Sequence, residues 1–251
     1  MSTAEPTPSR PTGPSGTSGH PSAPGTAEPP AEPPAEPPTE PPAEPVVPPL
    51  GTGPVRAVLL DADGVLQLIG TPWEQALTEA GGAEFAERLL VDERTALEGR
   101  ETLAAVLDRL VHRLGLTVGV EELMQAWWRA TPDPLARRLV ADLRAAGYRT
   151  VLATNQQVER MRWMRSQLGY DGLCDIDAYS CTLGAAKPDP RYFTAVLSLA
   201  GVSADEALFV DDNAENIAAA RALGIRVLHH PADAGGQELR RGVVDALTRH
   251  A

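Results

Sequence analysis

The sequence predicts a doubly wound α/β fold with a mainly parallel sheet. Short, nearly continuous apolar runs recur at residues 57–60, 150–153, 207–210 and 225–228. Runs of this length are typical of parallel strands buried on both faces, and stretches with helical periodicity separate them. Ligands of such folds bind at the carboxyl ends of the strands. A functional site is therefore expected among the polar residues that follow each run.

Helical patterns between the runs support this alternation. Residues 135–143 place four apolar side chains on one helical face and charged side chains on the other. Residues 239–247, after the last run, repeat the pattern. Strands that alternate with amphipathic helices predict a sheet covered by helices on both faces.

The first 54 residues differ sharply from the rest, because they hold 18 of the 24 prolines. An Ala-Glu-Pro-Pro unit repeats from residue 27 onward. Proline fixes φ and removes a backbone donor, so a disordered tail with polyproline II character is predicted for residues 1–54. The repeats carry Glu instead of the Arg or Lys that often orients proline-rich ligands. A solubilising spacer is thus favoured over a ligand for a proline-recognising partner.

Charge and composition exclude several classes of partner. The net charge is −12, with no basic block, which argues against nucleic acid or an anionic membrane surface. No apolar run approaches the roughly 18 residues of a membrane span, and a cytoplasmic protein is expected. The two cysteines, Cys174 and Cys181, fit neither a disulfide framework nor a zinc site and are expected to be reduced.

A stretch without strand signals follows the first apolar run. Thr71 to Glu74 has the pattern of a helix start with Thr71 as N-cap, and residues 103–114 and 120–129 have helical character. Residues 71–133 are therefore predicted to form a small all-helical cap, a natural lid above the strand ends. The α/β core would consist of residues 55–70 and 134–251.

Polar side chains follow the apolar runs at the points where the strands are predicted to end. Side chains two apart in a strand point the same way, so Asp61 and Asp63 address the same space. Carboxylates crowded together repel one another unless a cation lies among them, and hard oxygen ligands suit Mg²⁺. The polar residues expected at this edge are Asp61, Asp63, Thr154, Asn155, Lys187, Asp211 and Asp212.

Lys187 is the only lysine among 22 basic residues. Its ammonium is a compact charge on a flexible stem, suited to approaching a phosphoryl oxygen and a carboxylate together. It precedes Pro188-Asp189-Pro190, a predicted turn into a helix. The position favours a functional role.

Four segments of the chain, taken in order, resemble the motifs of the haloacid dehalogenase-like hydrolase superfamily. They are residues 58–65, 151–155, 187–190 and 208–216. The helical insert between the first two looks like the helical cap of that family. One departure is Ala62, where larger apolar residues are usual, which affects packing without removing a functional group.

The resemblance implies roles for the residues at the strand ends. Asp61 would attack phosphorus and form an aspartyl-phosphate, while Asp63 would protonate the leaving alcohol and then activate water. Thr154, Asn155 and Lys187 would bind the phosphoryl group.

The same resemblance implies a Mg²⁺ site that offsets the charge between the phosphoryl oxygens and the nucleophile. Its ligands would be Asp61, the backbone carbonyl of Asp63 and Asp212, with Asp211 bound directly or through water. The sequence leaves open which member of the Asp211–Asp212 pair touches the metal.

These features predict a Mg²⁺-dependent phosphomonoester hydrolase that acts on a small phosphorylated metabolite. A phosphomutase of the same fold, which uses the same residues, stays an alternative, as does a non-catalytic binding protein that uses the tail. Family members that cleave carbon–halogen bonds lack a second carboxylate at the position of Asp63, which disfavours a dehalogenase. A receiver domain of signalling proteins is rejected because its acidic pair comes early in the chain and no cap follows its first strand.

The insert is expected to select the substrate by contacting its leaving group. The candidates for this contact are Trp73, Arg94, Arg100, Trp127 and Trp128. Arg160, Arg162 and Arg165 recur at helical spacing, which is more typical of surface charges than of substrate contacts. His229 and His230 lack the spacing of a metal site, so structural or surface roles are favoured.

Overall fold

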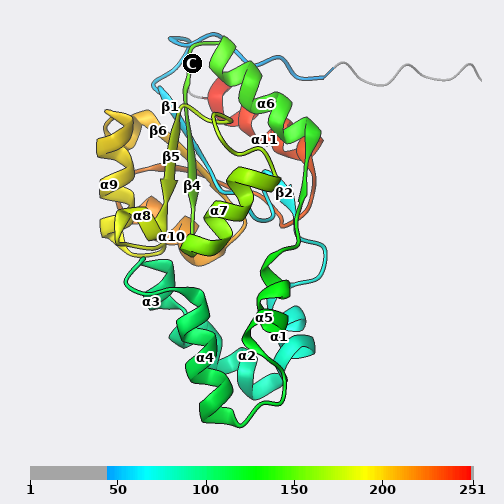
Figure 1. Ribbon diagram of the computed structural model, residues 1–251. Helices are drawn as coiled ribbons and strands as arrows, with labels where there is room; N and C mark the ends of the chain where they lie inside the picture. Colours follow the sequence, from blue (N-terminus) through cyan, green and yellow to red (C-terminus); the bar gives the residue numbers. More distant parts are fainter. Residues whose placement is uncertain (1–43, 250–251) are drawn as a thin grey trace, which may run out of the picture. The chain divides into compact units, whose positions relative to one another are not determined.

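The computed structural model describes residues 44–249 and confirms the predicted fold class (Figure 1). A five-stranded sheet has the order β5-β4-β1-β6-β7, and every neighbouring pair is parallel. Residues 1–43, most of the predicted tail, lie outside the described residues. The strands are β1 (Ala57–Leu60), β4 (Arg149–Thr154), β5 (Ile176–Tyr179), β6 (Ala207–Asp211) and β7 (Arg226–His229).

The register of the sheet brings the strand ends together. Leu60, the last residue of β1, pairs with Leu152 of β4 and with Val210 of β6. The residues that follow these positions therefore meet at one edge of the sheet. The chain continues to β4 on one side of β1 and to β6 on the other, so this edge is the switch point at which such folds bind ligands.

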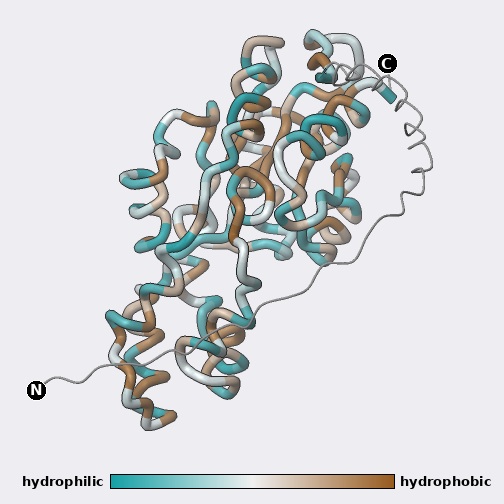
Figure 2. The backbone as a smooth tube through the Cα atoms, turned by 90° about the vertical axis from the view of Figure 1, so that its right-hand side faces the viewer, coloured by the Kyte–Doolittle hydropathy of each residue, from teal (hydrophilic) through white to brown (hydrophobic). Residues whose placement is uncertain are grey.

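Helices cover both faces of the sheet (Figure 1). Apolar side chains alternate along the strands, so that Val58 and Leu60 join one core cluster and Ala57 and Leu59 join the other. Hydrophobic residues follow one another in the central strands and recur at intervals in the helices (Figure 2). The first face is covered by α6 (Pro134–Ala145), α7 (Val158–Gln167) and α11 (Gly236–Thr248), the second by α9 (Pro190–Ala200) and α10 (Ala214–Ala222).

Residues 44–54, assigned from the sequence to the disordered tail, differ from that prediction. Val47 is buried in the core cluster beside α6 and α11. The carbonyl of Pro45 accepts a hydrogen bond from Arg240 of α11, and the amide of Leu50 donates one to the carbonyl of Ala146. This stretch packs against the core despite its prolines, because Val47 is buried and the backbone forms hydrogen bonds with the core.

The segment between β1 and β4 is mostly helical, and its helices share a core of their own. Leu77, Phe85, Leu107 and Trp127 are buried in this core. At its base, β2 (Gln67–Leu68) pairs antiparallel with β3 (Thr131–Pro132), which holds the two connecting chains together. The helices are α1 (Trp73–Gly81), α2 (Ala83–Asp92), α3 (Arg94–Leu97), α4 (Leu103–Leu114), α5 (Val120–Met124) and a 3₁₀ turn (Gln125–Trp127).

Three local expectations differ from the structure. The predicted N-cap at Thr71 is wrong, because α1 begins at Trp73 and the Thr71 carbonyl accepts a hydrogen bond from Arg129. The helix expected over residues 120–129 changes to a 3₁₀ turn after Met124. Strand β5 is not predicted, because Asp177 interrupts its short apolar run.

Short helices α8 (Ser180–Leu183) and η2 (Ala204–Glu206) complete the connections. No helix within residues 44–249 is both long enough and apolar enough to cross a bilayer. Cys174 and Cys181 are free thiols.

Candidate active site

Asp61 and Lys187 form a buried ion pair at the centre of the site. Asp61 follows β1 directly, and one of its carboxylate oxygens lies 3.0 Å from the Lys187 Nζ. Lys187 Nζ also donates to Asp211 at 2.6 Å and to the carbonyl of Ala153 at 2.9 Å. Burial opposes the charge of Lys187, but the carboxylates of Asp211 and Asp61 outweigh it and raise the pKa of the ammonium.

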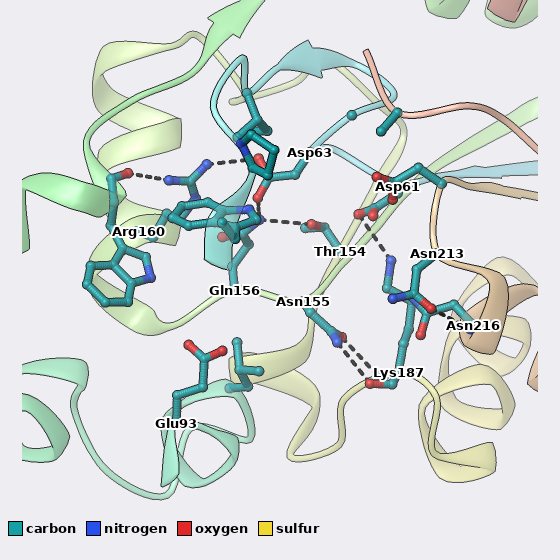
Figure 3. A pocket seen from close by; sticks show the side chains of 18 of the residues that line it. Asp61, Asp63, Glu93, Thr154, Asn155, Gln156, Arg160, Lys187, Asn213 and Asn216 are labelled. Atoms are coloured by element: carbon teal, nitrogen blue, oxygen red, sulfur yellow. Dashed lines mark hydrogen bonds and ion pairs between the residues drawn. The ribbon is translucent and has the colours of Figure 1, made fainter. Parts of the chain in front are cut away.

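Asn155 holds the backbone that carries Lys187. Its side-chain amide donates to the Lys187 carbonyl at 2.9 Å and accepts from the Lys187 amide at 2.8 Å (Figure 3). Both ends of the Asn155 side chain are thereby used, and the end of β4 is tied to the segment after α8.

Three carboxylates converge beside this pair. Asp61, Asp211 and Asp212 each present an oxygen within 4.8 Å of the others. Burial, and then Asp211 and Asp212, raise the pKa of Asp61 to about 8, with Lys187 opposing them. Burial and Asp211 raise the pKa of Asp212 to about 6. A divalent cation would relieve this crowding, and the hard oxygen donors fit Mg²⁺.

The two neighbouring aspartates have different surroundings. Asp211 is fully buried, and both its oxygens accept hydrogen bonds, one from Lys187 and the other from Asn213 and Asn216. Asp212 is partly exposed and lines the cavity.

Gly64 makes room for the Asp212 carboxylate. Gly64 has φ of +76°, and a Cβ at that position would lie 2.6 Å from an Asp212 oxygen. A side chain at residue 64 would therefore collide with the edge of the carboxylate cluster.

Asp63 points into the same cavity from the other side. One of its oxygens accepts hydrogen bonds from Gln67 and, at 2.8 Å, from Arg160. Its other oxygen accepts from Gln156 at 3.2 Å, and the same Gln156 amide donates to the Thr154 hydroxyl at 3.1 Å (Figure 3). Three side chains therefore donate hydrogen bonds to the Asp63 carboxylate and fix its orientation toward the cavity.

The carboxyl ends of β1, β4 and β6 thus open onto one cavity of about 680 Å³. This volume lies in the range typical of small-molecule sites. Core residues line one side and residues of the helical insert line the other. The sequence profile of the haloacid dehalogenase-like hydrolase family matches residues 55–224.

The chain belongs to the haloacid dehalogenase-like hydrolase family. Its sequence is 30% identical over 211 residues to phosphatase MT3486 of Mycobacterium tuberculosis, an alignment that covers 77% of this chain and 94% of that protein. It is 27% identical over 177 residues to the sesquiterpene phosphatase astK of Aspergillus oryzae, covering 63% of this chain and 90% of the relative.

A solved structure supports the fold of this hydrolase. A magnesium complex of the HAD family enzyme BT-2542 from Bacteroides thetaiotaomicron superposes with a TM-score of 0.61 at 23% identity. The superposition covers 72% of this chain and 94% of that one. At this level of identity the likeness is one of fold.

Arg160 of the hydrolase is not the surface charge that its helical spacing indicates. It is 1% exposed, donates to the Trp127 carbonyl as well as to Asp63, and its guanidinium lies 4.8 Å from the centre of the Trp73 ring. The insert covers this face of α7, which sequence periodicity within α7 does not reveal. Arg162 and Arg165 do not line the cavity.

The insert candidates divide into two groups. Trp73 and Trp127 line the cavity, with ring centres 6.1 Å apart. Trp128 instead packs against Trp163. Arg94 and Arg100 form ion pairs with Glu98 and are absent from the cavity lining.

Several residues of the site escape sequence analysis. Gln156 and Asn216 lie within or next to the motif segments, so their proximity was a usable signal. Glu93 and Gln157 form a hydrogen bond of 2.9 Å between the insert and the core. Glu93 lies at the junction of α2 and α3, in a stretch without a motif, and gives no signal in the sequence.

Proposed function

We propose that this hydrolase is a Mg²⁺-dependent phosphomonoester hydrolase that acts on a small phosphorylated metabolite through an aspartyl-phosphate intermediate. The observation that carries the proposal is the meeting of Asp61, Thr154 and Lys187 beside the acidic cluster, with Asp63 facing the same cavity. A second carboxylate in reach of a leaving group supports phosphate ester hydrolysis over carbon–halogen cleavage.

In the first step, an Asp61 oxygen attacks phosphorus and the ester P–O bond breaks. Asp63 donates a proton to the departing alkoxide, which leaves as an alcohol. Lys187 and the Thr154 hydroxyl, whose oxygen accepts from Gln156 and whose proton is free to donate, would bind the phosphoryl oxygens.

In the second step, Asp63 takes a proton from water, whose oxygen attacks phosphorus. The Asp61–phosphorus bond breaks, and inorganic phosphate and the free carboxylate form. Asn155, whose side chain is bound to the Lys187 backbone, would act mainly by fixing Lys187, so its own contact with substrate would come from its backbone.

The Mg²⁺ ligands in this proposal are Asp61, the Asp63 carbonyl and Asp212. Asp211 would support them through water, because its oxygens are already committed to Lys187 and to the Asn213 and Asn216 amides. When bound, the metal would offset negative charge between the nucleophile and the phosphoryl group.

Hydrolysis of p-nitrophenyl phosphate with Mg²⁺, compared with EDTA, tests the proposal. Turnover that needs Mg²⁺ and is lost in Asp61→Asn is expected. Turnover that persists in EDTA or in the variant would contradict the assigned roles. The names of the relatives MT3486 and astK, both called phosphatases, agree with the proposal.

A further inference from the structure

Glu93 places a carboxylate in the part of the cavity that faces away from the carboxylate cluster. It extends from the insert toward the cavity (Figure 3). One of its oxygens accepts from the Gln157 side-chain amide at 2.9 Å. Within residues 44–249, no protein group donates a hydrogen bond to the other oxygen.

The cavity that Glu93 lines has a mainly apolar wall on the side of the insert. The insert and the adjoining connection contribute seven apolar side chains to the lining. Burial raises the pKa of the Glu93 carboxyl to about 7, with Gln157 and Arg160 opposing the shift. Apolar side chains offer the Glu93 carboxyl no hydrogen-bond donors. The apolar residues are Ile69, Pro72, Trp73, Leu77, Leu90, Leu97 and Trp127.

A second hydrogen-bond acceptor without a donor in the described part of the chain lies beside Glu93. The Gln157 side-chain oxygen is buried and accepts no hydrogen bond within residues 44–249. Lys187 and Arg160 are the cationic side chains in the described lining, and both are engaged by aspartates. A second anionic group on a substrate would therefore meet Glu93 without a free cation to balance it.

We infer that the preferred substrates are phosphomonoesters whose alcohol part has an apolar body and an amino group. Glu93 accepts a hydrogen bond from this amino group of the leaving alcohol. This inference rests on the proposed function and adds a substrate class to it. Trp73 and Trp127 contact the apolar body, and Glu93 pairs with the ammonium through a charge-assisted hydrogen bond in a partly buried site. Alcohols that carry a carboxylate are excluded by charge.

Matched phosphate esters test this assignment. Hexyl phosphate, ω-aminohexyl phosphate and ω-carboxypentyl phosphate are compared by kcat/KM, with the butyl series covering a shorter reach. The amino ester is expected to exceed the alkyl ester by about tenfold or more, since a hydrogen bond between charged groups is worth about 1.5–3 kcal/mol. In Glu93→Gln this advantage is expected to disappear.

Asp92→Asn is the control, because it makes the same chemical change one residue away. Asp92 is ion-paired with Arg113 and does not line the cavity. This variant is expected to keep the preference for the amino ester. An equal preference in Glu93→Gln, or a wild-type preference for the carboxylate ester, would overturn the inference.

Binding separates this inference from the proposed function. Dissociation constants for the same esters are measured in Asp61→Asn, with and without Glu93→Gln. A preference for the amino ester that depends on Glu93, without turnover in the wild type, would retain the binding site and reject the phosphatase. Turnover of the alkyl esters without any dependence on Glu93 would retain the phosphatase and reject the inference.

Discussion

Replacing Glu93 by Gln removes an ionisable group from the apolar part of the cavity while keeping its shape. The side-chain oxygen of the introduced amide can still accept from Gln157, as the carboxylate does at 2.9 Å. The variant therefore differs mainly in its inability to ionise, so its stability relative to wild type should depend on pH.

The direction and size of this pH dependence follow from the raised pKa of Glu93. Burial moves the pKa of Glu93 from 4.5 to about 7, so the unfolded chain releases this proton at lower pH than the native protein does. Wild type thus loses stability as pH rises from about 4.5 to about 7. Each tenfold change in proton affinity is worth about 1.36 kcal/mol, which sets an upper limit of about 3 kcal/mol. Water in the cavity reduces this, and about 1–3 kcal/mol is expected.

Urea unfolding at pH 5 and pH 8 in EDTA measures the effect, with Asp92→Asn as control. The free energy of unfolding of Glu93→Gln, relative to wild type, should rise by about 1–3 kcal/mol between the two pH values. The control should show no such trend. A difference that stays constant, or that falls toward pH 8, would show that Glu93 is stabilised as a carboxylate and would refute the reasoning.

Three further substitutions probe the site. Gly64→Ala sets a Cβ 2.6 Å from an Asp212 oxygen. It should raise the Mg²⁺ concentration for half-maximal turnover by about tenfold. An unchanged Mg²⁺ requirement would count against Asp212 as a ligand. Lys187→Arg should lower kcat/KM by about 100-fold or more, because a planar guanidinium cannot replace a compact ammonium between two carboxylates; near-wild-type turnover would contradict this. Arg160→Met should lower the free energy of unfolding in urea by about 3 kcal/mol, since it leaves Asp63 without its buried partner. A change below about 0.5 kcal/mol would show that the ion pair contributes no more than an exposed one does.

The meeting of Asp61, Thr154 and Lys187 could be anticipated from the sequence. Parallel strands carry their carboxyl ends to one edge, and Asp61 and Thr154 stand at the ends of β1 and β4, so local patterns were enough for these two. Lys187 lies after α8, away from any strand end, and was anticipated only from its motif. The functional roles of these residues stay predictions. Their burial and spacing agree with the chemistry that the motifs imply.

The cavity wall formed by the insert could not be anticipated. The place of Glu93 depends on how α2 and α3 pack against the core, and no local pattern encodes that contact. For the same reason, the prediction from helical spacing that Arg160 is a surface charge is wrong. The periodicity of α7 shows a polar face but not that the insert covers it. A close backbone approach such as Gly99 against Cys181 is likewise visible only in three dimensions.

The most direct measurement of the proposed mechanism is the capture of phosphate on Asp61. In Asp63→Asn, p-nitrophenyl phosphate should still phosphorylate the enzyme, because nitrophenolate leaves without a proton, while breakdown is slow without the base. Quenching after a burst of nitrophenolate, followed by borohydride reduction and mass spectrometry, should convert Asp61 to homoserine. A burst with an unmodified Asp61, or modification at another residue, would contradict the account.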